Sequence, residues 1–142
     1  MKKNSGFTLA EVIIVIVIIG ILSIIAVPVY RDHVRKSVSV EGQALLSEIM
    51  AAQEIYQARN KTWFAASSYT ATAASYIPEI GVDARRNKYF NRFTWREFKN
   101  ANDDAISFSV TTSGISDTRA EGIHLTLNYY KGKAYEIEQN YN

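Results

Sequence analysis

Hydrophobic residues are concentrated at the N-terminal end of this chain. The segment Val12–Tyr30 is almost unbroken aliphatic sequence, interrupted only by Gly20, Ser23 and Pro28. The 24 residues of 7–30 would form a helix about 36 Å long, which exceeds the roughly 30 Å hydrocarbon thickness of a bilayer. We therefore predict that 7–30 is a transmembrane helix.

A narrower hydrophobic pattern follows from Arg31 onward. Apolar residues recur at steps of seven, four, three and four, which places them on one face of a helix: Val38, Leu45, Ile49, Ala52 and Tyr56. The opposite face carries Lys36, Gln43, Ser47 and Glu54, and the stripe is flanked by Glu41 and Glu48. We predict one helix from Phe7 to about Asn60, whose second half, 31–60, is amphipathic. Two helices divided near Tyr30 are the alternative, although no linker composition occurs there.

The C-terminal part of the chain is patterned as strands. Alternation, together with β-branched and aromatic residues, predicts four strands at Tyr89–Phe98, Ala105–Thr112, Gly122–Tyr130 and Ala134–Ile137. We expect a tight hairpin turn at Lys131–Lys133 and a connecting loop at 61–88, in which Thr62–Pro78 lacks clear periodicity. The expected fold class is α+β, in which the long N-terminal helix packs its amphipathic half on an antiparallel sheet of about four strands within 89–142.

Length and composition narrow the classes of protein. A chain of 142 residues favours one domain with one modest core. The formal net charge of +2 is too balanced to suggest nucleic acid as an obligate partner. Cysteine is absent, which excludes a disulfide framework, a thiolate metal site and a cysteine nucleophile.

The remaining polar residues form no catalytic constellation. His33 follows the apolar run and His124 alternates with apolar residues of a predicted strand, so we expect two exposed histidines rather than a base. Asp103 with Asp104, or Asp117 with Glu121, offers a calcium loop as an alternative, but such pairs of loop acids are more often simply solvated. We predict that the chain is not an enzyme and holds no metal or cofactor.

Charged residues beside and within the apolar run carry further information. Lys2 and Lys3 precede the run without any acid, and positive charge keeps that end of a membrane helix in the cytoplasm. Glu11 lies inside the run, where a lone acid costs roughly 2.5 to 3.5 kcal/mol. An ordinary secretory signal would need small residues after the run, and Ala26–Pro28 is a poor cleavage site. A permanent signal anchor leaves Glu11 unexplained.

The sequence Gly6-Phe7-Thr8-Leu9-Ala10-Glu11, between a short basic leader and an aliphatic helix, resembles the class III signal of type IV prepilins and pseudopilins. The resemblance implies that 1–6 is a leader, that a prepilin peptidase cuts after Gly6, and that Phe7 becomes an N-methylated N-terminus. Cleavage would remove two lysines and leave 14 basic and 14 acidic side chains on 136 residues. Residues 31–142 would then form the globular domain of a pilin.

The same resemblance implies how copies of the chain assemble. Phe7 and Glu11 are four residues apart and share a helix face, and the resemblance implies that Glu11 pairs with the Phe7 amine of a neighbouring copy. A pair within one chain is the alternative. Pro28 lacks a backbone donor and should kink the helix, and by resemblance the helix between Gly20 and Pro28 unwinds when subunits pack.

The implied function is that of a structural subunit of a type IV pilus, serving adhesion, twitching motility or DNA uptake. Its implied partners are other copies of itself, prepilin peptidase, the inner-membrane assembly platform and the secretin, with the membrane during staging. The implied location is the inner membrane, single-pass with a cytoplasmic N-terminus, and then the extracellular pilus.

Two alternatives stay open from the sequence. One is a pseudopilin of a type II secretion system, and the other is a minor pilin that binds DNA or a surface. A basic cluster supports the second alternative: Arg85, Arg86, Lys88, Arg92 and Arg96. An ordinary charged face toward solvent is the competing interpretation of that cluster.

Overall fold

The computed structural model of the chain describes residues 6–64, 74–99, 106–130 and 132–141. It divides into two units, Met1–Val34 and Arg35–Asn142, and each is described by itself. The predictions about the two leader lysines, the Asp103–Asp104 pair and Lys131 lie outside the described residues.

Helix α1 runs from Leu9 to Asn60 and contains Pro28. Its C-terminal end is closed by two local hydrogen bonds. The Lys61 N–H donates to the Gln57 carbonyl at 2.8 Å, and the Asn60 amide donates to the Tyr56 carbonyl at 3.0 Å. Lys61 has a φ of 59°, the left-handed conformation in which helices commonly stop. The predicted helix end near Asn60 is therefore confirmed.

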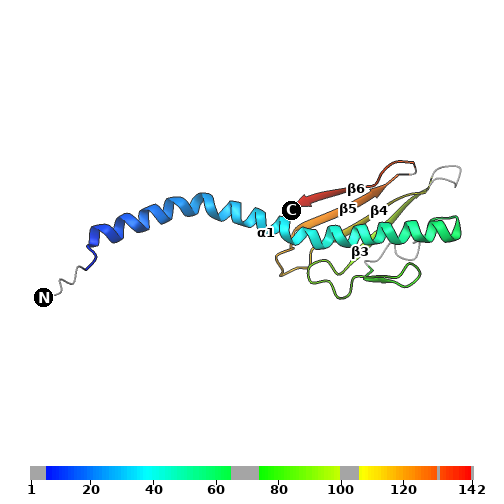
Figure 1. The fold of residues 1–142 in the computed structure, drawn as a ribbon, viewed down its shortest axis with the longest axis horizontal. Coiled ribbons are helices and arrows are strands. Elements are labelled where there is room, and N and C mark those ends of the chain that lie inside the picture. The colour runs from blue at the N-terminus through cyan, green and yellow to red at the C-terminus, as the bar shows by residue number, and fades with distance from the viewer. Residues whose placement is uncertain (1–5, 65–73, 100–105, 131, 142) are drawn as a thin grey trace. The chain divides into compact units, whose positions relative to one another are not determined.

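The C-terminal part of the chain forms an antiparallel meander (Figure 1). The strands are β3 (Phe93–Lys99), β4 (Ile106–Ser113), β5 (Ile123–Tyr129) and β6 (Glu136–Tyr141), and they lie in the order β3-β4-β5-β6. Because each strand pairs with the next along the chain, the connections are hairpins. The predicted α+β class, with one long helix and a four-stranded antiparallel sheet, is confirmed.

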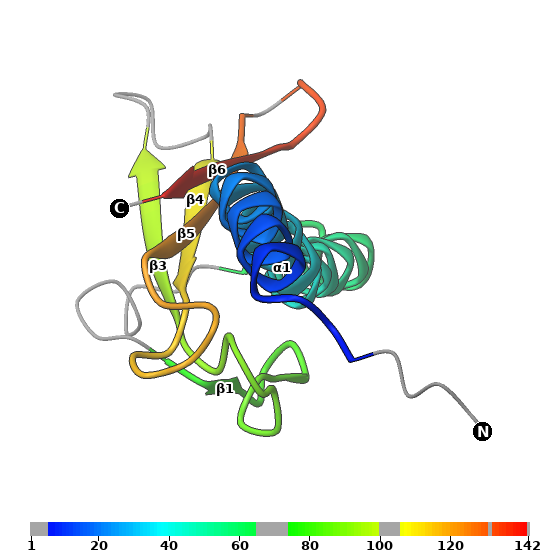
Figure 2. The ribbon, with the colours of Figure 1, turned by 90° about the vertical axis from the view of Figure 1, so that its left-hand side faces the viewer.

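The second half of α1 lies against one face of this sheet (Figure 2). Its buried residues are Val38, Ser39, Gly42, Leu45, Leu46, Ile49, Met50 and Gln53. Facing them are the alternate residues of the strands, among them Phe93, Trp95, Phe108, Val110, Ile123, Leu125 and Leu127. Burial of these aromatic and aliphatic side chains supplies the main stabilisation of the domain.

The buried face of α1 is wider than the predicted stripe. Gln43 and Ser47, which we expected opposite the stripe, are half-buried, and Gly42 is buried. A Cβ added at Gly42 would lie 2.4 Å from Cδ1 of Leu125, so the helix approaches the sheet closely at this glycine. Spacing of apolar residues alone missed this contact because glycine contributes no hydrophobic signal.

Two predicted strands were placed wrongly. The first begins at Phe93 rather than Tyr89, because the backbone N–H groups of Tyr89 and Phe90 donate to Oε1 of Glu41, at 2.6 and 3.0 Å, instead of joining a ladder. The last strand runs from Glu136 to Tyr141, beyond the predicted end at Ile137. The sequence there is polar, but its pairing with β5 continues as far as Ile123↔Tyr141.

The predicted loop 61–88 also contains a small second sheet that the sequence did not reveal. Strands β1 (Tyr76–Ile77) and β2 (Val82–Asp83) pair in antiparallel register around a turn. Gly81 takes a φ of 75° there, a conformation that favours glycine. Ile77 and Val82 are buried, so this sheet closes one side of the core.

A fully buried glutamine on α1 holds the segment that follows the helix. The side chain of Gln53 accepts from the Phe64 N–H at 3.0 Å and donates to the Phe64 carbonyl at 3.2 Å. We expect Gln53→Leu to lower the free energy of unfolding by about 1 to 3 kcal/mol, because both backbone groups would be left buried without partners.

Urea unfolding of the detergent-solubilised chain, followed by tryptophan fluorescence, measures this loss. Gln57→Leu, one turn further along α1, is the matched control. Gln57 is half-buried, and within the described ranges the two hydrogen bonds to the Phe64 backbone come from Gln53. Equal midpoints for the two variants would show that the buried amide is dispensable.

Tyr129 packs in an aromatic cluster, with its ring centroid 4.6 Å from that of Trp63 and 5.1 Å from that of Phe108. Burial raises the pKa of its phenol, and the charge of Glu54 adds to the effect. The fold therefore favours the neutral phenol. This contribution to stability is complete below the unfolded-state pKa of about 10 and is lost as pH rises through the folded-state value.

We expect the melting temperature of the wild-type chain to fall more steeply between pH 9 and 11.5 than that of Tyr129→Phe. Other tyrosines ionise in both proteins, so the difference between the two profiles isolates Tyr129. Parallel profiles would contradict the expected coupling.

Candidate functional site

The first turn of α1 forms a reciprocal cap. The Thr8 N–H and the Thr8 hydroxyl both donate to Oε2 of Glu11, at 2.8 and 2.7 Å. In return, the Glu11 N–H donates to the Thr8 hydroxyl oxygen at 3.3 Å. This arrangement is a capping box, in which threonine at the N-cap and glutamate three residues later satisfy each other's backbone groups.

The cap adds Thr8 to the residues that the sequence analysis selected. The signal was present as the spacing Thr8-Leu9-Ala10-Glu11, which fits the capping-box pattern at a helix start. Within a single chain, Glu11 therefore has a partner of its own. The alternative of a pair between Glu11 and the amine of its own Phe7 competes with this cap for the same carboxylate.

The apolar run of α1 is exposed along its whole length in the single chain. Exposure of the large side chains between Val12 and Val29 runs from 47% for Ile13 to 75% for Ile24. Among the described residues one helix, α1, is long and apolar enough to cross a membrane, and none of its apolar window is buried. A helix that is hydrophobic all round is stable only inside a membrane or an assembly of proteins.

Gly6 and Phe7 precede the helix and are open to solvent. A Cβ at Gly6 would meet nothing within 4 Å, and Phe7 is 88% exposed. Access to the peptide bond between them is therefore unobstructed by the described part of the chain.

Gly20 and Pro28 both lie within α1. Between them, the Ser23 hydroxyl donates to the Ile19 carbonyl at 2.7 Å, a local bond that competes with the helical ladder and often bends helices. The kink at Pro28 and the unwinding between Gly20 and Pro28 stay predictions.

The predicted basic cluster lies in the connection from β2 to β3 and on β3 itself. Arg85 is held by Asp83, with Nε to Oδ1 at 2.8 Å and Nη2 to Oδ2 at 2.7 Å, and its guanidinium lies over the Tyr76 ring. These hydrogen bonds lower the pKa of Asp83 to about 2. Arg86, Lys88, Arg92 and Arg96 are exposed. Among the described residues, the structure thus pairs Arg85 with an acid, and the other four cations are exposed.

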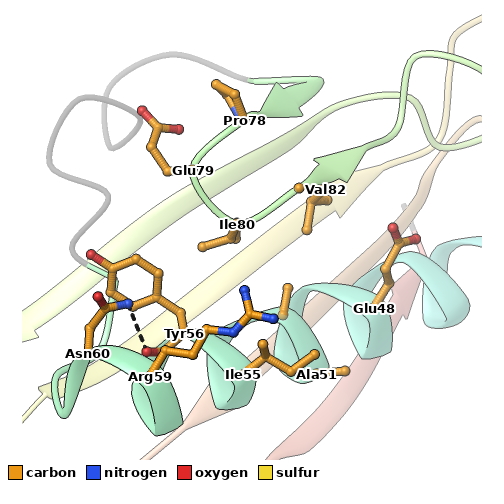
Figure 3. Close-up of a pocket in the computed structure, with 12 residues that line it drawn as sticks. Glu48, Ala51, Ile55, Tyr56, Arg59, Asn60, Pro78, Glu79, Ile80 and Val82 are labelled. Atoms are coloured by element: carbon orange, nitrogen blue, oxygen red, sulfur yellow. Dashed lines mark hydrogen bonds between the residues drawn. The ribbon is translucent and has the colours of Figure 1, made fainter.

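A groove of about 670 Å³ separates the end of α1 from the turn between β1 and β2 (Figure 3). Ala51 and Ile55 of α1, Ile80 of the turn and Val82 of β2 give it an apolar lining, with charged residues such as Glu48 at its rim. Its described lining residues include no serine, threonine, cysteine, lysine or histidine.

Neither histidine is among the described residues that line this groove. His33 is exposed on α1, whereas His124 is half-buried on β5 and its Nδ1 lies 2.8 Å from the Ser113 hydroxyl. Near the alternative calcium loop, the Glu121 carboxylate accepts from the Asp117 N–H at 3.1 Å. No group of three or more potential metal ligands occurs within the described ranges.

The chain is similar to fimbrial proteins and pilins among the known proteins. The family described as "Prokaryotic N-terminal methylation motif" matches residues 1–27. A type IV major alpha-pilin of Moraxella bovis is 57% identical over 127 residues, which cover 89% of this chain and 70% of that protein. A fimbrial protein of Moraxella nonliquefaciens is 32% identical over 120 residues, covering 82% and 73% of the two chains. No solved structure gives a significant match.

Proposed function

This chain belongs to the type IV pilin family, and we propose that copies of it polymerise through the exposed apolar segment of α1 into the shaft of an extracellular pilus. The observation that carries the proposal is the apolar run, which is exposed along its length in a single chain and has one acid at its start. A type IV pilus subunit is the role that the named relatives support.

Maturation by a prepilin peptidase is part of this proposal. The peptidase cuts after Gly6 and the new amine of Phe7 is methylated. The exposure of both residues supports this step. The methylation-motif match over residues 1–27 also supports it. Cleavage separates the insertion signal, with Lys2 and Lys3, from the assembly segment.

Assembly then exchanges the partners of Glu11. In the single chain its carboxylate is satisfied by Thr8. In the filament we propose that the carboxylate pairs with the Phe7 amine of a neighbour, which compensates two charges that are costly to bury separately. Because that pairing has one geometry, it sets the axial register of neighbouring copies.

The proposed route places the chain first in the inner membrane, with its N-terminus in the cytoplasm, and then on the cell surface. The assembly platform and the secretin are its proposed partners on this route, and adhesion, twitching motility or DNA uptake are its proposed uses. This structural role requires no catalysis by the chain.

Expression of the full chain in a bacterium that lacks its own major pilin tests the proposal. We expect sheared surface fibres whose subunit begins at N-methylated Phe7 by mass spectrometry. Fibre-free cells in which the chain keeps residues 1–6 would refute both maturation and polymerisation.

A further inference from the structure

The outer face of the sheet, opposite α1, is charged at its two edges and neutral between them. One row of paired residues runs from Arg96 on β3 through Ser109 and Asn128 to Glu136 on β6. The adjacent row runs through Thr94, Thr111 and Thr126 to Glu138. Each row therefore ends on an acid at the β6 edge, and the first begins on a base at the β3 edge.

The β3 edge carries a second base besides the one in that row. Arg92 directly precedes β3 and is exposed. We call Arg92 and Arg96 the basic edge. Neither of these two side chains forms an ion pair within the described part of the chain, where Arg85–Asp83 is the pair that occurs. Arg86 and Lys88 are not counted, because the backbone N–H groups of the next residues, Tyr89 and Phe90, donate to Glu41 on α1.

The opposite edge carries the complementary charge. Glu136 and Glu138 are exposed on β6 and point away from α1, whereas Gln139 points toward the helix, where its Oε1 lies 3.5 Å from Oγ of Ser39. We call Glu136 and Glu138 the acidic edge. Lys133 is exposed in the turn before β6 and does not belong to the strand.

We propose that the basic edge of one subunit docks beside the acidic edge of the next subunit in the filament. This inference rests on the proposed polymerisation and names the surface that globular domains share. Two basic edges or two acidic edges would repel, so a two-fold contact is disfavoured. A contact between two different edges of identical copies is heterologous and propagates without closing, which is the symmetry that a filament requires.

The charge balance favours a second copy over a polyanion as the occupant of the basic edge. After loss of residues 1–6 the chain has 14 basic and 14 acidic side chains, so its cations are matched by acids on the same molecule. A polyanion would be repelled by the acidic edge, whereas another copy of the chain offers an acidic edge to the basic edge and a basic edge to the acidic edge. The backbone of Phe93 is already hydrogen-bonded to Ala74 and cannot pair with a strand of another copy. At this position the proposed contact is therefore made by side chains.

Charge reversal in the full-length chain tests the contact, with fibre yield as the readout. We expect R92E/R96E and E136R/E138R each to lower the yield of sheared fibres by about tenfold or more, and their combination to restore it. Arg119→Glu, exposed in the β4–β5 connection, is the control and should leave the yield unchanged. Immunoblots of membrane fractions confirm that each variant accumulates.

Cysteine cross-linking gives a second readout that does not depend on yield. The chain has no native cysteine. Arg96 and Glu136 stand three strand spacings apart, about 14 Å, which is too far for a disulfide within one domain. Oxidised fibres of R96C/E136C should therefore give a ladder of dimers and longer oligomers, and R96C paired with E54C, on α1, should not.

The outcomes separate this contact from the proposed function. If the wild type forms fibres but oxidised R96C/E136C fibres give no ladder, or if both charge reversals reach wild-type yield, the edge contact is overturned and the pilus subunit stands. R92E/R96E fibres that form normally but lose binding to double-stranded DNA would make the basic edge a polyanion surface instead. Absence of wild-type fibres would overturn both proposals.

Discussion

Replacing Glu11 with leucine is expected to abolish fibres while membrane insertion and leader cleavage continue. Glu11 is the one charged residue between Lys3 and Arg31, so Glu11→Leu removes an insertion cost of roughly 2.5 to 3.5 kcal/mol. In the filament the same change leaves the Phe7 amine buried without an opposite charge. Breaking a buried ion pair costs about 3 to 5 kcal/mol, so fibre yield should fall roughly a hundredfold or more.

Two matched variants distinguish the charge of Glu11 from its role in the cap. Glu11→Gln keeps an acceptor for Thr8 but has no charge, and glutamine also serves in capping boxes. Thr8→Val keeps the carboxylate but removes the hydroxyl that bonds to it. We expect Glu11→Gln to fail like Glu11→Leu and Thr8→Val to assemble, as measured by sheared fibres and by mass spectrometry of the processed N-terminus. The opposite pattern would make Glu11 a helix cap and exclude charge pairing as its role.

Gly114→Ala is expected to be the most damaging small substitution in the globular domain. An added Cβ would lie 1.8 Å from the carbonyl oxygen of Ala120 and 2.4 Å from its carbonyl carbon. These are backbone atoms of a buried residue, so no rotamer change relieves the clash. The Gly114 N–H also donates to the Ile123 carbonyl at 2.9 Å, which ties the end of β4 to β5.

We expect Gly114→Ala to lower the free energy of unfolding by about 3 kcal/mol or more, because the whole β4–β5 connection must shift. Urea unfolding in detergent measures the loss. Ser116→Ala, exposed in the same connection, is the control and should stay within about 0.5 kcal/mol of the wild type. A Gly114→Ala chain as stable as this control would show that the connection moves freely.

The two glycines that matter for packing illustrate what sequence patterns omit. Gly42 allows α1 to approach Leu125, and Gly114 allows the β4–β5 connection to close over Ala120. Glycine has no hydrophobic side chain, so the spacing of apolar residues gave no sign that either position is packed. Hydrophobic patterning also missed Gln53, because a polar residue contributes nothing to an apolar stripe. Its hydrogen-bond partner, the Phe64 backbone, follows the end of the helix and comes near Gln53 only in the folded chain.

The sequence by itself determined the long helix, the four-stranded meander and the family resemblance, and it singled out Glu11 for the proposed assembly role. These inferences depend on local periodicity and on an acid inside an apolar run. Only the tertiary structure decided the strand register, the small β1–β2 sheet, and the hydrogen bonds from the Tyr89 and Phe90 backbone to Glu41. It also separated the basic edge from the acidic edge. Residues 40 positions apart become neighbours or opposites only through strand pairing, which no local pattern encodes.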